Sequence, residues 1–168
     1  MTTTRHYVEQ KIAAILDIDA AFAAIKRFKI GIQYRVPIQD YPFGEIVILG
    51  EDEFDEETGI VNREYTGEIR FEVLQQDTST VVGRIEVIES YVNIDALVDA
   101  AVKLLRKSAN RTLGGLQDTV NNPAQWSVQD FTIGSSVRYG FGQRDERENL
   151  FQNFGIIPFI CRTRELKT

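Results

Sequence analysis

Cysteine and histidine are almost missing from this chain of 168 residues, and their scarcity removes several kinds of chemistry. Cys161 is the only cysteine, so no disulfide can form within the chain. It lies in an apolar stretch, which predicts a buried, unreactive thiol rather than a nucleophile. His6 is the only histidine, so a metal site with several histidine ligands is excluded, as is a His-based triad built elsewhere in the chain. We expect His6 to be an exposed polar residue.

Long apolar runs and phosphate-binding motifs are missing as well. No uninterrupted apolar stretch approaches the roughly 18 residues that a membrane span needs. The opening segment, MTTTRHYVEQ, lacks the apolar core of a signal peptide, and we therefore expect a soluble protein made in a cytoplasm. The pair Gly114 and Gly115 is not a phosphate loop, because no Gly-Lys-Ser or Gly-Lys-Thr follows and no strand leads into it.

Basic residues are outnumbered by acidic ones, which gives a formal net charge of −6 at pH 7. A surface that grips duplex DNA neutralises phosphates with Lys and Arg, so that function is disfavoured. An acidic surface that does not hold DNA remains open. Hydrophobic residues make up 43% of the chain, which is typical of a globular protein, and the length suits a single domain over residues 1–168.

An N-terminal helix is predicted by apolar residues at three- and four-residue spacing. These are Val8, Ile12, Ile15, Leu16, Phe22 and Ile25. Because Asp17 and Asp19 favour caps over helix interiors, we expect either one bent helix to about Phe28 or two short ones. Gly31 is the expected end of this helical region.

A long amphipathic helix is predicted further along, with Asn93 as its N-cap. Its apolar stripe consists of Ile94, Leu97, Val98, Ala101, Leu104 and Leu105. Asp99 and Lys103 lie one turn apart and can form an ion pair. The segment NRTLGGLQDTVNNP then predicts a loop.

Alternating apolar residues predict strands at 32–36 and 65–74, and the apolar run IVIL predicts a buried strand within 43–49. In the strand at 65–74 the expected buried face is Tyr65, Gly67, Ile69, Phe71 and Val73. The segment 81–88 predicts either another strand or an approach to the long helix. The whole pattern favours an α+β fold. We expect a mixed, mainly antiparallel sheet flanked by the N-terminal helix and the long helix, with a long C-terminal β-hairpin.

The C-terminal hairpin is predicted by two apolar segments. Val128, Phe131 and Ile133 alternate with polar residues, and FGIIPFI follows at 154–160. Trp126, at the start of the first segment, is expected to be a core or interface anchor. Between the segments lies GFGQRDERENLFQN, which predicts a protruding charged arm at about 140–149.

The arm is a candidate interface because a long part of it has no apolar residue to bury in a monomer. This part comprises Gln143, Arg144, Asp145, Glu146, Arg147, Glu148 and Asn149. We expect it to contact a neighbouring subunit or a partner ring rather than its own core, with charge selecting the partner. A solvated hairpin tip is the alternative.

A block of like charge forms a second candidate surface. It consists of Glu51, Asp52, Glu53, Asp55, Glu56 and Glu57. Such a block repels itself, so we expect a solvated acidic loop. A weak cation site is the alternative, but Gly59 is misplaced for a calcium loop and the alternating ligands are missing. We expect no metal, no cofactor and no catalytic residues.

Basic residues concentrate near the C-terminus, whereas the acidic block lies in the middle of the chain. The basic residues are Arg138, Arg144, Arg147, Arg162 and Arg164. Opposite patches on one protein favour head-to-tail contacts between subunits, and such contacts close into rings when the rotation allows. Scattered surface charge is an equally simple reading of the pattern.

The order of elements, with the helical segment NIDALVDAAVKLLRKSANRTLGGL before two closing strands, resembles the tail terminator proteins of long-tailed bacteriophages. The resemblance implies a virion protein of the tail and neck, assembled in the host cytoplasm, and not an enzyme. It implies a homohexameric ring that caps the tail tube, stops its elongation and joins the tail to the head connector. The implied partners are the tail tube protein and a head-side connector or stopper protein, with DNA passing through a central channel without specific binding.

Two other classes remain open. One is a different neck component, such as a head-completion or stopper protein, which would form a similar ring against the portal. The other is a small ligand-binding α/β protein or enzyme. That class needs a polar cluster in a pocket, and the sequence offers no obvious one.

Overall fold

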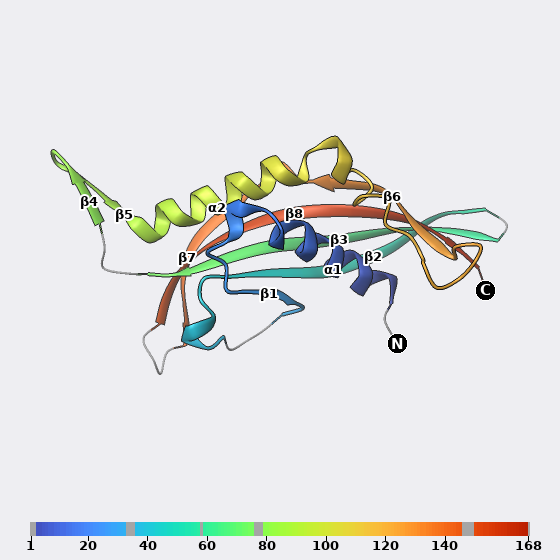
Figure 1. Ribbon diagram of the computed structural model, residues 1–168, viewed down its shortest axis with the longest axis horizontal. Helices are drawn as coiled ribbons and strands as arrows, with labels where there is room; N and C mark the ends of the chain where they lie inside the picture. The colour runs from blue at the N-terminus through green and yellow to red at the C-terminus, as the bar shows by residue number, and fades with distance from the viewer. Residues whose placement is uncertain (1–2, 33–35, 58, 76–78, 146–149, 168) are drawn as a thin grey trace.

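A curved sheet of long strands runs the length of the molecule, and helices lie along it (Figure 1). The computed structural model describes residues 3–32, 36–57, 59–75, 79–145 and 150–167. Its α-helices are α1 (Thr4–Asp17) and α2 (Glu89–Leu105), and short 3-10 turns occupy Ala20–Phe22, Ile38–Asp40 and Ser108–Asn110. The strands are β1 (Arg27–Ile30), β2 (Phe43–Glu57), β3 (Ile60–Leu74), β4 (Ser79–Val82), β5 (Ile85–Ile88), β6 (Trp126–Ile133), β7 (Arg138–Asp145) and β8 (Leu150–Leu166).

The main sheet has the order β1-β2-β3-β8-β6, and β7 also pairs with β8. The β1–β2 pair is parallel and the other pairs are antiparallel. β6 pairs with the C-terminal half of β8 and β7 with its N-terminal half, so β6 and β7 follow one another along one edge. The predicted α+β class, with a mainly antiparallel sheet and a C-terminal hairpin, is confirmed.

The larger of the two hydrophobic clusters in the described ranges lies between the helices and one face of the sheet. Tyr65, Gly67, Ile69 and Phe71 are buried on this face of β3, as their alternation predicted, while Val73 is partly buried. The helices contribute a second set of buried side chains: Val8, Ile12 and Leu16 from α1, and Ile94, Leu97, Val98, Ala101 and Leu105 from α2. The apolar spacing of both helices therefore identified the core correctly.

Of the two predicted forms, the N-terminal region adopts the two-part form. A helix is followed by a separate 3-10 turn. Asp19 caps that turn by accepting a hydrogen bond from the Ala21 N–H at 3.0 Å. The prediction of helix to Phe28 is wrong, because Arg27–Ile30 pairs with β2 as a strand. Gly31, with φ of 86°, follows this strand rather than a helix. Of the strand predicted at 32–36, residues 33–35 lie outside the described residues, and Ile32 and Val36 are in no strand.

The long helix begins at Glu89, so Asn93 is inside it and the N-cap prediction is wrong. Tertiary contact explains the earlier start, since the buried Ser90 hydroxyl accepts a hydrogen bond from Asn153 of β8 at 2.6 Å. The predicted pair between Asp99 and Lys103 is confirmed, at 2.6 Å. The segment 81–88 contributes to a hairpin, β4–β5, that continues directly into α2.

Gly67 lets two elements approach β3 more closely than a side chain would allow. A Cβ at this position would lie 2.5 Å from the Val47 carbonyl oxygen and would overlap the ring of Phe159. We predict that Gly67→Ala lowers the free energy of unfolding by about 1–3 kcal/mol, because the buried ring and backbone must shift. Urea denaturation measures the change.

Gly142→Ala is the matched control, because a Cβ there meets Phe154 at an ordinary 3.7 Å and the backbone is extended. Its expected effect is within about 0.5 kcal/mol of zero. Equal losses from the two substitutions would contradict the close approach at Gly67.

Candidate assembly interface

Chemically reactive side chains are not gathered in the described part of the chain. No group of three or more His, Cys, Asp or Glu side chains there could hold a metal ion. Cys161 is fully buried, as predicted, and burial raises the pKa of its thiol to about 12. His6 is exposed on α1, where its Nδ1 lies 2.8 Å from the Thr3 hydroxyl. Of the helices in the described ranges, none has the length and apolar character to cross a membrane.

The predicted charged arm is mostly strand. Gln143, Arg144 and Asp145 belong to β7, which pairs with β8, and residues 146–149 lie outside the described residues. A glycine at position 140 leaves room for the Phe154 ring against the backbone of β7, which allows the two strands to pack closely. Residues 140–145 of the predicted arm therefore belong to a paired strand. Contact with a neighbouring subunit stays a prediction.

The acidic block is not a loop, and that prediction is wrong. Residues 51–57 complete β2 and pair with β3, and the side chains of Glu51, Asp52 and Glu53 are exposed. Asp55, Glu56 and Glu57 are also in the strand, but their side chains lie outside the description. The repulsion expected of the block is offset by a cation on the neighbouring strand.

That cation is Arg63 of β3. Its guanidinium lies 2.7 Å from Glu53 and 3.1 Å from Glu165 of β8, and it also pairs with Glu51. The Tyr65 hydroxyl donates a hydrogen bond to Glu165 at 3.1 Å, and burial together with the nearby carboxylates raises the pKa of this phenol. The acidic strand is thus stabilised by a charged cluster drawn from β2, β3 and β8.

A β-bulge determines which acidic side chains reach Arg63. The pairing of β2 with β3 shifts between Ile48 and Gly50, so one extra residue is inserted. Before the bulge Ile46 faces the core, whereas beyond it Glu51 is opposite Tyr65 and Glu53 is opposite Arg63. The helix side supports the bulge, because the buried Glu9 carboxylate accepts the Ile48 N–H at 2.9 Å.

Two of the C-terminal basic residues are paired within their own sheet rather than forming a free patch. Arg162 lies 2.8 Å from Glu64, and Arg138 pairs with Glu68. Arg164 is exposed, while Arg147 and the side chain of Arg144 are outside the described set. The sheet face opposite the helices therefore carries paired opposite charges, and the hypothesis of a separate basic patch loses two of its members.

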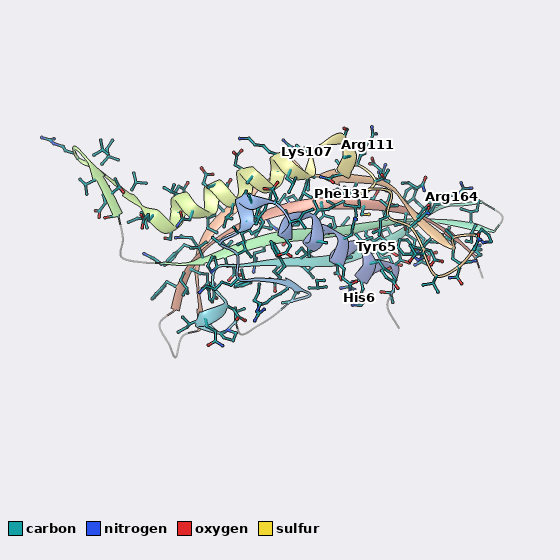
Figure 2. All side chains as sticks on the ribbon, viewed as in Figure 1. His6, Tyr65, Lys107, Arg111, Phe131 and Arg164 are labelled. Atoms are coloured by element: carbon teal, nitrogen blue, oxygen red, sulfur yellow. The ribbon has the colours of Figure 1, made fainter. Side chains whose placement is uncertain are left out.

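The β4–β5 hairpin is an apolar surface that sequence reasoning did not single out. Every one of its side chains is exposed, and the hairpin projects beyond the N-terminal end of α2 (Figures 1 and 2). Residues directly opposite each other share a face, and the register pairs Val82 with Ile85 and Thr80 with Val87. These four residues form what we call the apolar hairpin face. The exposed fractions of Val82 and Ile85 are 68% and 66%.

More apolar surface lies between the hairpin and the main sheet. A cavity of about 480 Å³ there is lined by residues that include Val87, Tyr91 and Phe141. The Phe141 and Phe151 rings are stacked at 5.5 Å, yet both remain partly exposed. A signal for the hairpin was present in the sequence, since Gly83 and Arg84 separate two β-branched runs.

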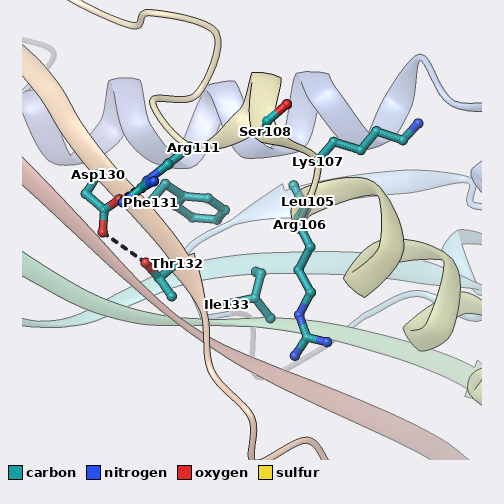
Figure 3. A pocket seen from close by; sticks show the side chains of 9 residues that line it. All are labelled: Leu105, Arg106, Lys107, Ser108, Arg111, Asp130, Phe131, Thr132 and Ile133. Atoms are coloured by element: carbon teal, nitrogen blue, oxygen red, sulfur yellow. Dashed lines mark hydrogen bonds and ion pairs between the residues drawn. The ribbon is translucent and has the colours of Figure 1, made fainter.

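A groove lies at the opposite end of α2 (Figure 3). Its volume is also about 480 Å³, and the apolar side chains that line it are those of Leu105, Phe131 and Ile133. The other lining residues are Arg106, Lys107, Ser108, Arg111, Asp130 and Thr132. Arg111 pairs with Asp130 at 3.0 Å, and Leu105, Phe131 and Ile133 are buried, so the exposed charge at the edge of the groove comes from Arg106 and Lys107. We call it the α2–β6 groove.

Comparisons with protein-family models and with curated proteins find no match to this chain.

The charged cluster yields a stability prediction. Arg63→Met keeps the aliphatic stem but leaves three carboxylates together without their cation, so we expect a loss of about 2 kcal/mol in the free energy of unfolding at pH 7. Arg162→Met is the control, because Arg162 is half-exposed and pairs with Glu64 alone among the ion pairs described, which predicts about 0–1 kcal/mol. Chemical denaturation of both variants measures the difference. Equal losses would show that the cluster does not hold the acidic strand.

A pH prediction comes from the loop between α2 and β6. The Asp118 carboxylate accepts hydrogen bonds from the Asn121 side chain at 2.8 Å and from the Gln125 and Val120 N–H groups, which lowers its pKa to about 2. Because the folded pKa lies below the unfolded value of about 3.9, the contribution of Asp118 is full above that pH and is lost as pH falls toward 2.

We therefore expect Asp118→Asn to be less stable than wild type at pH 7, and the gap to narrow between pH 4 and pH 2. Denaturant midpoints measured across this range provide the test. A gap that stays constant with pH would contradict the role of the ionised carboxylate.

Proposed function

We propose that this protein is a structural subunit of the neck of a long-tailed bacteriophage. In this proposal several copies form a ring that caps the tail tube, ends its elongation and joins the tail to the head-side connector. The order of elements supports the proposal by its resemblance to tail terminators, and the virion is the corresponding location.

The observation that carries the proposal is the apolar hairpin face. An isolated two-stranded hairpin is at best marginally stable in water, and β-branched side chains favour a covered surface. The hairpin contacts α2 through β5, and an open cavity lies between the hairpin and Phe141 of β7. In an assembly a neighbouring subunit can bury such a face, whereas in a monomer the face stays exposed to water.

Charge is consistent with a channel that passes DNA. The net charge of −6 and the exposed acidic end of β2 disfavour a tight hold on phosphates. The paired charges on the sheet face opposite the helices leave little excess positive charge there. A ring built from this chain would therefore let DNA slide rather than bind it.

The proposal predicts rings in electron micrographs of the purified protein, each with a central channel. Added to the tail tube protein from the same genome, the rings should bind tube ends and stop elongation, which measured tube lengths will show. Binding to the portal assembly in place of tube ends would instead favour a head-completion or stopper protein. A monomer that leaves tube lengths unchanged would contradict both assignments.

A matched variant tests the charged arm within the same experiment. Deletion of residues 143–148 removes the end of β7 and shortens its connection to β8. It leaves β6 and its pairing with β8 unchanged. We expect a folded protein with weakened ring formation or weakened docking on tubes. Normal rings and normal capping would show that the arm is only a connection.

A further inference from the structure

Along residues 139–142, the outer edge of β7 lacks the features that keep sheet edges from pairing with other chains. This stretch reads Tyr-Gly-Phe-Gly, without charge, proline or bulge. The β6 edge is covered, because the Val128 N–H donates to the Leu116 carbonyl at 2.9 Å. The free part of β2 carries acidic residues at 51–53, and β1 is only four residues long. β7 therefore offers the edge of the main sheet that is open to another strand.

The backbone of β7 presents hydrogen-bonding groups on this edge. The Phe151 carbonyl accepts the Gln75 N–H at 2.9 Å, so the odd-numbered residues in this part of β8 point toward β3 and the even-numbered ones toward β7. The register places Tyr139 and Phe141 opposite odd-numbered residues of β8. The N–H and C=O groups of Tyr139 and Phe141 therefore point outward, and the described contacts include no backbone partner for them.

We propose that the β7 edges of two copies of this chain pair in antiparallel orientation about Gly140 and join the two main sheets into one. In this register Tyr139 of each copy lies opposite Phe141 of the other, and each such pair exchanges both backbone hydrogen bonds. The inference goes beyond the proposed function, because a two-fold contact closes at two subunits and does not itself build a ring. Between assembled rings the same contact would join one ring to a second.

Side chains on both faces of the joined sheet suit a second copy of this chain. On the helix face, Tyr139 and Phe141 are 46% and 57% exposed, and the register brings them together across the strands in two aromatic pairs. A register centred on Phe141 would pair Tyr139 with Gln143 and leave a single aromatic pair. On the other face, Arg138 lies opposite Gly142 of the second copy, so no like charges meet there.

The helices leave room for this contact. α2 packs over β8 and β3, so the α2 helices of the two copies would be at least about 14 Å apart, the width of three strand spacings. Packed helices approach to about 8–10 Å, so the two helices do not collide. The acidic residues near this seam already have partners, since Asp95 accepts a hydrogen bond from the Tyr139 hydroxyl and Asp99 pairs with Lys103 at 2.6 Å.

Proline at position 141 tests the backbone pairing. Phe141→Pro removes an outward N–H but none that bonds β8, so it should raise the dissociation constant of the dimer at least about thirtyfold. Phe141→Ala is the matched control, because it removes the same ring and keeps the N–H, and it should raise that constant by no more than about tenfold. The two variants should have the same unfolding midpoint in urea. Sedimentation over a dilution series measures the dissociation constants.

Charge at position 142 tests the register. Gly142→Asp places a carboxylate opposite Arg138 of the second copy and should lower the dissociation constant at least about threefold. Gly142→Lys places like charges there and should raise it at least about threefold. Either side chain fits the monomer, because a Cβ at this position makes only ordinary contacts, the nearest at 3.7 Å.

The outcomes separate this contact from the proposed function. A wild-type chain without dimers or paired rings at its highest soluble concentration would overturn the contact. Equal effects of proline and alanine at position 141, or of aspartate and lysine at position 142, would overturn it as well. The tube-length assay tests the proposed function separately, and its failure would leave the pairing of β7 edges standing.

Discussion

The pairing of β3 on both sides is the constraint on which the rest of the structure depends. Its fifteen residues run between β2 and β8, and the register to β8 is continuous from Ile60 to Leu74. A shift by one residue would turn the core side chains of the strand to the opposite face of the sheet, away from the helices. Gly67 tightens this constraint, because both Phe159 and the Val47 carbonyl occupy the space where a side chain would be. The helices then pack on a face that is already defined.

The bulge in β2 extends this sheet beyond the region that the helices cover. Before the bulge the strand carries apolar residues toward the core, and beyond it Glu51 and Glu53 continue the same face and reach Arg63. An acidic stretch that would repel itself as a solvated loop is thereby held in a strand by one shared cation. The charged cluster from three strands offsets the repulsion among these carboxylates. The sheet is therefore extended without additional apolar core.

Long periodic elements could be predicted from the sequence, and contacts between distant segments could not. The stripe of α2 and the alternation of β3 repeat over many residues, so they identified the core. A run of like charges predicts a solvated loop, and no local pattern shows that Arg63 on the next strand, which also pairs with Glu165 of β8, offsets the repulsion. The start of α2 depends on Asn153 of β8, which is remote in sequence. Glycines and charges at 140–149 predict a protruding arm and hide the pairing of residues 140–145 with β8. For the candidate interface, the sequence pattern predicted the charged segments, whereas the hairpin at 79–88 was not predicted although Gly83 separates two β-branched runs.

The position of the hairpin follows from the same packing. The first turn of α2 is tied to β8 by Ser90 and Asn153, and the Tyr139 hydroxyl hydrogen-bonds Asp95 from β7. The hairpin continues directly from this fixed turn, so its apolar face is held at a defined place relative to the sheet rather than on a free linker. Apolar side chains that share one face are normally buried. The helices and the main sheet of this fold follow that rule, and the hairpin does not. A departure of this kind, presented on a rigid support, is expected where a subunit meets its neighbour, because a preorganised surface loses less entropy on binding.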